Sequence, residues 1–154
     1  MDKYIESADL FEEIMMRGAE QMVKRIDHPL WREYSPQQLR LMKLVEQMGS
    51  MTAGQLADMT QVHKSAISNR LKKLTEKGLV KVERMEHDNR ISAITITPAG
   101  KATVGQAYEV LYGHIKKLVK ESLAEDELDQ FIRSLRKLKQ MLERAEHPPD
   151  SNRE

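Results

Sequence analysis

The spacing of apolar residues changes within residues 52–97. A short helical pattern is followed by a polar turn, and Ile67, Leu71 and Leu74 then recur at the i, i+4, i+7 spacing of a second helix. After Gly78, which suits the position just past a helix, β-branched residues on either side of another polar turn indicate two strands. Helix, turn, helix and hairpin together predict a winged helix-turn-helix.

Longer helical patterns precede this segment. Apolar residues at helical spacing predict one helix over residues 3–26. The stretch Ser35-Pro36-Gln37-Gln38 has the serine, proline and glutamine of a capping-box helix start, and this helix should reach Gly49. Trp31 and Tyr34 are expected in the connection between the two helices.

Two further helices are predicted after the hairpin. Thr97-Pro98 begins one, whose apolar residues step by three and four along a heptad-like seam. The acidic run 125–127 begins the last helix, which His147-Pro148-Pro149 should end. The expected fold class is therefore mainly α (α+β), a winged helix-turn-helix with long N- and C-terminal helices.

A helix with a narrow apolar seam must bury that seam against another element. We therefore expect residues 1–34 and 99–147 to be dimerisation helices around a winged helix-turn-helix domain at residues 35–98. An intrachain helical bundle is the alternative. The polar residues 148–154 are expected to form a disordered tail.

Composition narrows the class of protein. With 32% charged residues, a mean hydropathy of −0.62 and no apolar run of bilayer length, the sequence indicates a cytoplasmic protein without membrane segments. It has no cysteine, which excludes disulfides and thiol-based sensing. Residues 60–90 contain eight Lys or Arg against four Asp or Glu, whereas residues 1–59 contain seven against ten. The positive charge thus lies on the second helix and the hairpin, where a DNA-binding surface needs it.

The outward face of the second helix has small polar groups between basic ones. Ser65, Ala66 and Asn69 suit contacts with base edges in a major groove, because Asn can bind adenine and a methyl group can contact thymine. Ser68 flanks them. The basic residues are expected to contact phosphates: Lys64, Arg70, Lys72 and Lys73. An ordinary solvated helix face is the alternative.

The hairpin offers a second contact. Arg90, in the polar turn 86–90, is positioned to enter a minor groove, and Asp88 is placed to orient its guanidinium group. Arg84 is a nearby cation. A plain turn with an incidental arginine is the alternative.

The sequence resembles the MarR family of bacterial regulators over nearly its whole length. The stretches that carry the resemblance are Ser35 to Leu39, Gln55-Leu56-Ala57, Lys64 to Ser68, Leu71 to Leu74, Lys77-Gly78-Leu79-Val80, Asp88-Asn89-Arg90 and Thr97 to Gly100. The resemblance implies a homodimer on a palindromic operator, usually a repressor, often released by a small aromatic ligand. Two positions depart from the family pattern: His63 replaces the usual cap of the recognition helix, and Val82-Glu83 stand where a basic residue is frequent.

Other candidate sites are weaker. Met15, Trp31, Tyr34 and Met42 could line an apolar ligand pocket, although packing is the ordinary explanation for such residues. The five histidines are scattered without metal-ligand spacing, so we expect no metal or cofactor. Nothing resembles a nucleophile with its base, so an enzyme is not expected. The alternative function is a winged-helix protein-interaction module without sequence-specific DNA binding.

Overall fold

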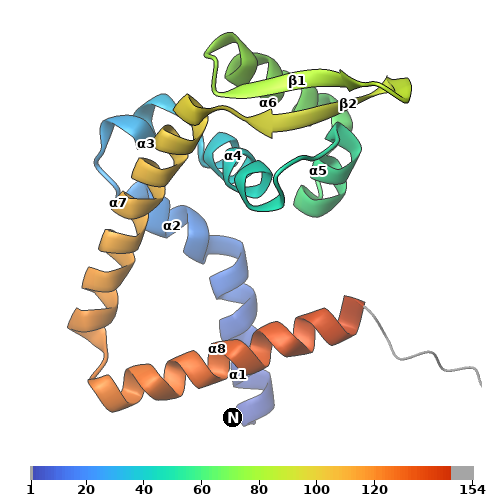
Figure 1. Cartoon of the computed structure of the whole chain (residues 1–154). Coiled ribbons are helices and arrows are strands. Elements are labelled where there is room, and N and C mark those ends of the chain that lie inside the picture. Colours follow the sequence, from blue (N-terminus) through green and yellow to red (C-terminus); the bar gives the residue numbers. More distant parts are fainter. Residues whose placement is uncertain (1, 147–154) are drawn as a thin grey trace, which may run out of the picture. The chain divides into compact units, whose positions relative to one another are not determined.

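The computed structural model describes residues 2–146, which form two compact units. One unit ends at Tyr112 and the other begins at Gly113, so the division falls within a long helix. The chain order is α1 (Lys3–Glu13), π-helical η1 (Ile14–Gly18), α2 (Ala19–Lys24), α3 (Pro29–Glu33), α4 (Pro36–Met48), α5 (Ala53–Thr60), α6 (Lys64–Glu76), β1 (Val80–Met85), β2 (Asp88–Ile96), α7 (Pro98–Ser122) and α8 (Glu125–Glu146) (Figure 1). This order confirms the predicted winged helix-turn-helix between flanking helices.

The N-terminal segment differs from the prediction in two ways. The single helix expected over residues 3–26 is α1, η1 and α2 in succession, with a π-helical turn that ends at Gly18. The connection expected after it contains the short helix α3, which includes Trp31 and is capped at its C-terminus by Tyr34. Helix α2 ends at Lys24, before Pro29 is reached, and Pro29 occupies the first turn of α3, where its missing N–H leaves no bond unmade.

Local capping fixes the starts of α4 and α5. The Ser35 hydroxyl accepts a hydrogen bond from the Gln38 amide and the Gln38 side chain accepts one from the Ser35 amide, which confirms the predicted capping box. Thr52 and Gln55 form the same reciprocal pair at the start of α5. Gly49 ends α4 at φ 80°, a backbone conformation that glycine enters without a Cβ penalty.

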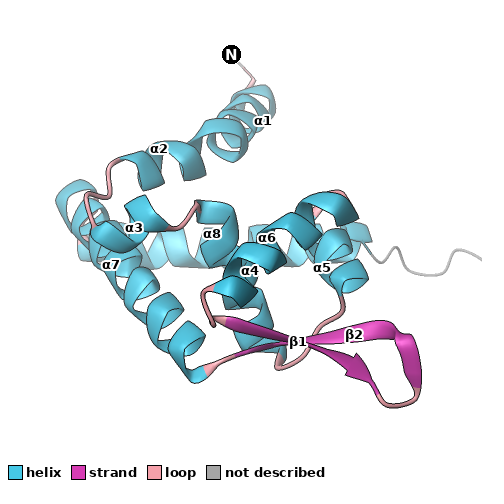
Figure 2. Cartoon of the chain, turned by 90° about the horizontal axis from the view of Figure 1, so that it is seen from above, coloured by secondary structure: helices cyan, strands magenta, loops and turns pink. Residues whose placement is uncertain are grey.

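The hairpin is longer than predicted and closes more tightly. β1 and β2 pair antiparallel from Val80 opposite Ile96 to Met85 opposite Asp88, so the turn is only Glu86 and His87. The hairpin extends beyond the neighbouring helices (Figure 2). Met51 adds an isolated bridge on the other side of β2, with backbone hydrogen bonds of 3.0 and 2.7 Å to Ile94.

The core lies between α4, α5, α6 and the sheet, and α7 closes it. The largest fully buried side chains come from each of these elements: Leu39, Leu41, Met42, Val45, Leu56, Ile67, Leu74, Val80, Ile94 and Val104. Every third or fourth residue of the helices therefore shares one apolar interior with Val80 of β1 and Ile94 of β2. In the other unit, α8 begins with Glu127 accepting a hydrogen bond from the Ala124 amide, as the acidic start predicted.

The predicted stop at His147-Pro148-Pro149 and the tail 148–154 lie outside the described residues. None of the helices within residues 2–146 is long and apolar enough to cross a membrane.

Candidate nucleic-acid interface

The helix α6 is packed so that one face is buried and the opposite face is open. Ile67, Leu71 and Leu74 are buried in the core, as their spacing predicted. The tight turn before α6 places Gln61 at φ 53°, and the Val62 amide donates to the Ala57 carbonyl at 3.1 Å. This turn fixes the angle between α5 and α6, which presents the far face of α6 to solvent.

All the predicted contacts on α6 lie on this open face. Lys64, Ser65, Ser68, Asn69, Lys72 and Lys73 are exposed, and Ala66 and Arg70 are partly exposed. The Ser68 hydroxyl donates to the Lys64 carbonyl at 3.0 Å, so its oxygen keeps lone pairs for an outside donor. Within residues 2–146 no hydrogen bond engages the Asn69 side chain, which leaves the amide free for a ligand.

The N-terminus of α6 lacks the side-chain cap that α4 and α5 have. His63 makes no side-chain cap, whereas Ser35 and Thr52 cap α4 and α5. The weak cap predicted from the sequence is therefore confirmed. His63 thus gives the first-turn amides of α6 no side-chain acceptor, although its backbone carbonyl accepts from the Ala66 amide at 3.0 Å.

The wing differs in detail from the prediction. Arg90 lies within β2, three residues beyond the Glu86-His87 turn, and is exposed. Asp88 does not pair with the Arg90 guanidinium group in the part of the chain that the structure describes, and its carboxylate instead accepts a hydrogen bond from the Arg90 backbone amide at 2.9 Å. Because a two-residue turn makes Asp88 the first residue of the return strand, its short side chain reaches the backbone two residues on. Asp88 thus fixes the wing backbone rather than the arginine side chain.

Between α6 and the wing lies a cavity of about 470 Å³. Arg84 is exposed on β1 and shares a strand face with Val82, which lines the cavity. Apolar side chains and a polar rim form the lining: Ala53, Ser68, Leu71, Lys72, Thr75, Glu76, Val82, Ser92 and Ile94. The sequence does not indicate this cavity, because its lining comes from four elements, α5, α6, β1 and β2, whose approach depends on the tertiary fold.

The four residues of the predicted ligand pocket are placed differently from one another. Tyr34 and Met42 are buried in the core, and Trp31 packs against it while its indole N–H donates to the Ala107 carbonyl at 3.0 Å. Met15 lies in η1 and is 64% exposed. Packing accounts for the first three, and the ligand pocket stays a prediction. Among the described residues, no three His, Asp or Glu are grouped to hold a metal.

These features define the class of the protein. A helix-turn-helix whose second helix presents polar and basic groups, followed by a two-stranded wing and joined to long terminal helices, is the architecture of a winged-helix regulator.

Comparison with known proteins identifies the particular family. The model of the MarR family matches residues 34–92. The uncharacterized HTH-type transcriptional regulator YdgG of Bacillus subtilis (strain 168) is 34% identical over 132 residues, which cover 84% of this chain and 86% of YdgG. The chain belongs to the MarR family of transcriptional regulators.

Solved structures share the fold. The transcriptional regulator BldR from Sulfolobus solfataricus aligns with a TM-score of 0.71 and 27% identity, covering 94% of this chain and 99% of BldR. A mutant of MarR from E. coli, crystallised in complex with operator DNA, aligns with a TM-score of 0.65 and 19% identity over 90% of this chain and 99% of that one. The predicted family and fold are thus confirmed.

Proposed function

We propose that this regulator is a cytoplasmic homodimeric repressor, which binds a palindromic operator and acts by binding rather than by catalysis. The observation that carries the proposal is the open face of α6, whose polar side chains are exposed while its apolar face is buried in the core. A helix presented in this way fits a major groove, and two-fold symmetry would place two such helices one DNA turn apart, about 34 Å. That the related MarR mutant was crystallised with operator DNA supports this use of the fold.

Each exposed side chain has a proposed role. Ser65, Ala66 and Asn69 read base edges, with Ser68 beside them. The cations of α6 hold the phosphates on either side: Lys64, Arg70, Lys72 and Lys73. On the wing, Arg84 and Arg90 follow the flanking minor groove while Asp88 holds the backbone beneath Arg90.

The terminal helices supply the dimer contacts in this proposal. In α1 and η1 the exposed large apolar residues are Tyr4, Ile5, Leu10, Ile14, Met15 and Met16. In α8 they are Phe131, Ile132, Leu135, Met141 and Leu142. Continuous apolar stripes of this kind are characteristic of surfaces that a partner covers, and a second copy of this chain supplies the matching stripe.

A small-molecule effector fits the cavity between α6 and the wing. The cavity combines an apolar lining with Ser68 and Lys72, both of which are proposed DNA contacts. A ligand seated there would therefore compete with DNA for the same side chains. The Trp31 and Tyr34 region remains the second proposed place for an effector, favoured by its aromatic side chains alone.

Binding to DNA of known sequence tests the proposal. Duplexes selected from a random-sequence pool would supply the operator, and fluorescence anisotropy over a series of salt concentrations would measure affinity. Log affinity should fall with log salt at about −0.9 per phosphate contacted, and Asn69→Ala should lose about 1–3 kcal/mol of discrimination at one base pair. Lys73→Ala should weaken all sequences equally and reduce the slope by about 1.

Lys137→Ala, on the exposed face of α8, is the matched control and should change neither quantity. Failure to select any duplex, together with salt-independent binding to a protein partner, would favour the protein-interaction module.

A further inference from the structure

The recognition helix α6 ends in a tight corner formed by residues 77–79. Gly78 adopts φ 69°, its amide donates to the Thr75 carbonyl at 2.9 Å, and the Leu79 amide donates to the Leu74 carbonyl at 2.9 Å. The left-handed glycine and the two bonds back into the last turn redirect the chain from α6 into β1. The direction of α6 is therefore linked to whatever holds this corner.

The start of α7 holds one side of the corner. The Thr97 amide donates to the Leu79 carbonyl at 3.0 Å, and the Thr97 hydroxyl donates to the Gly78 carbonyl at 2.7 Å while it accepts from the Gly100 amide at 3.0 Å. A Cβ on Gly100 would lie 2.0 Å from the Leu79 carbonyl oxygen. The first turn of α7 thus rests directly on the backbone of the corner.

Lys77 holds the other side of the corner through α3. Its Nζ lies 2.8 Å from Oε1 of Glu33 and 4.6 Å from the centre of the Tyr34 ring. The hydrogen bond lowers the pKa of the Glu33 carboxyl and raises the pKa of Lys77. Tyr34 is only 7% exposed and belongs to the core, so the lysine is drawn onto a fixed aromatic surface rather than a mobile one.

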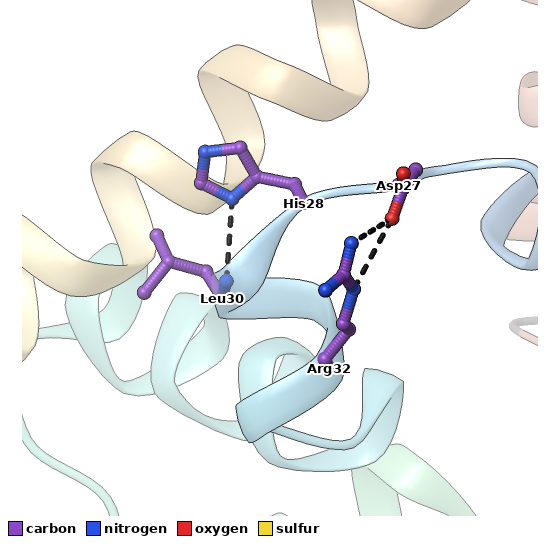
Figure 3. A network of polar contacts seen from close by, with 4 residues as sticks. All are labelled: Asp27, His28, Leu30 and Arg32. Atoms are coloured by element: carbon purple, nitrogen blue, oxygen red, sulfur yellow. Dashed lines mark hydrogen bonds and ion pairs between the residues drawn. The ribbon is translucent and has the colours of Figure 1, made fainter.

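The short helix α3 is itself held in place. Figure 3 shows its entry, where the His28 ring nitrogen Nδ1 accepts from the Leu30 amide at 3.2 Å and Asp27 binds the guanidinium group of Arg32. The indole of Trp31 then joins α3 to α7 through the Ala107 carbonyl. Because α3 is capped, ion-paired and bonded to α7, it can serve as a rigid support for Lys77.

We propose that Lys77 is a positioning residue for DNA recognition, which sets the half-site spacing that the dimer accepts by tying the end of α6 to Glu33 and Tyr34. The inference rests on the proposed function, since it requires a homodimer on a palindrome. A 13-residue helix is about 20 Å long, so a rotation of roughly 10° at the corner moves the far end by about 3.5 Å. That displacement equals the rise of about one base pair, roughly 3.4 Å. A rotation of this size at Lys77 therefore moves Ser65, near the far end of α6, by about one base-pair step, and it moves Asn69, nearer the corner, by about 2 Å.

Lys77 could otherwise act as one more phosphate contact, and charge separates the two roles. Glu33→Gln leaves the lysine cation in place and removes its ionic partner, whereas Lys77→Ala removes the cation itself. If Lys77 positions α6, both variants lose the preference for one half-site spacing. If Lys77 binds phosphate, Glu33→Gln frees it and affinity does not fall.

The experiment uses full-length protein and duplexes selected from a random pool, with the two half-sites at the selected spacing and one base pair closer or farther. Wild type should prefer one spacing by about tenfold or more. Lys77→Ala and Glu33→Gln should each reduce that preference about fivefold, with the salt slope unchanged. The double variant should show no further loss, and Glu33→Lys with Lys77→Glu should restore the part of the preference that the ion pair supplies but not the part that the cation over the Tyr34 ring supplies. The matched control is Lys81→Ala, which removes an exposed lysine of β1 and should keep the wild-type spacing preference.

Two results would overturn the inference alone: wild-type spacing preference in both single variants, or a Lys77→Ala affinity loss that is equal at all spacings with a slope reduced by about 1. A spacing change in Glu33→Gln by itself suffices to support it if Lys77→Ala does not fold. Wild-type protein that binds no selected duplex would instead overturn the proposed function, and the inference with it.

Discussion

The winged helix-turn-helix and the terminal helices bury their apolar residues to different extents. In the domain formed by α4, α5, α6 and the hairpin, inward residues such as Leu56, Ile67 and Leu74 are fully buried within one chain. In α8, by contrast, Leu135 remains 46% exposed and Phe131 45%. The same helical spacing of apolar residues thus leads to a completed core in one region and an open stripe in the other.

The difference follows from geometry. Short elements that alternate in direction cover one another, so α5, α6 and the hairpin close a core with few residues. A helix of 22 residues, such as α8, presents a stripe about 33 Å long, which needs an equally long partner. Amphipathic spacing therefore shows that one face of a helix must be buried. The length of the helix indicates whether other elements of the same chain can cover that face.

The largest effect is expected in the completed core. Leu74→Ala removes a fully buried side chain from the core in which α6 packs against α5 and β1, and should lower the free energy of unfolding by about 2–5 kcal/mol. Because the contacts are within one chain, the loss should be the same at every protein concentration in denaturant titrations.

Leu142→Ala is the matched control, since the same side chain is deleted from a position on α8 that is 48% exposed. In dilute protein it should have little effect on unfolding. Equal losses for the two variants would contradict the contrast between the regions.

The contact between α7 and the corner at residues 77–79 should show the next largest effect. Gly100→Ala forces a methyl group to within 2.0 Å of the Leu79 carbonyl oxygen, so the start of α7 must move, and we expect a loss of about 1–3 kcal/mol. Gly105→Ala in the same helix meets no atom within 4 Å and should stabilise by about 0.5–1 kcal/mol. Thermal unfolding of the two variants measures the expected loss of stability in Gly100→Ala and the expected gain in Gly105→Ala. A destabilised Gly105→Ala with an unaffected Gly100→Ala would contradict the close contact between α7 and the corner.

Features of the fold that depend on near neighbours in the sequence were predictable. Ser35 with Gln38 and the inward spacing of Ile67 and Leu71 are set within one or two turns of helix, and the structure confirms them. The missing cap at His63 was visible for the same reason, because capping depends on the side chain at one position.

Other features depend on distant residues, and the sequence did not show them. The sequence pattern predicts the wing turn at residues 86–90, whereas strand pairing continues to Met85 and Asp88 because backbone pairing does not require apolar side chains. The bridge of Met51 to β2 and the pair of Lys77 with Glu33, 44 residues away, have no local signature. The residues proposed to contact DNA are exposed or partly exposed, and their contacts with DNA remain a proposal.

In the open stripe of α8 the expected effect is smaller and depends on concentration. Leu135→Ala should weaken the dimer by about 1 kcal/mol for each substituted side chain, because about half of the leucine surface remains to be buried by a partner. Sedimentation at several micromolar concentrations would show the shift toward monomer. Arg136→Ala, on the exposed polar side of the helix, should leave the distribution unchanged, and a wild-type protein that sediments as a monomer at these concentrations would remove the basis for the dimer.

The smallest effect is expected at alkaline pH, where the packing of α7 on α4 is tested through Tyr108. Burial of its hydroxyl raises the pKa of Tyr108, with the neighbouring Tyr112 adding to the shift. A group whose pKa is raised on folding contributes stability that is complete below its unfolded value, about 10, and is lost as the pH rises through the folded value. Wild-type stability should therefore fall above pH ~10, and the stability of Tyr108→Phe, which keeps the ring beside Lys43, should fall less steeply.

Denaturant titrations at pH 8, 9.5 and about 10.5 compare how steeply the stability of each variant falls with pH. The control is Tyr4→Phe, at an 84% exposed position, which should follow wild type. Parallel curves for wild type and Tyr108→Phe would mean that this hydroxyl is as well solvated in the folded protein as in the unfolded chain.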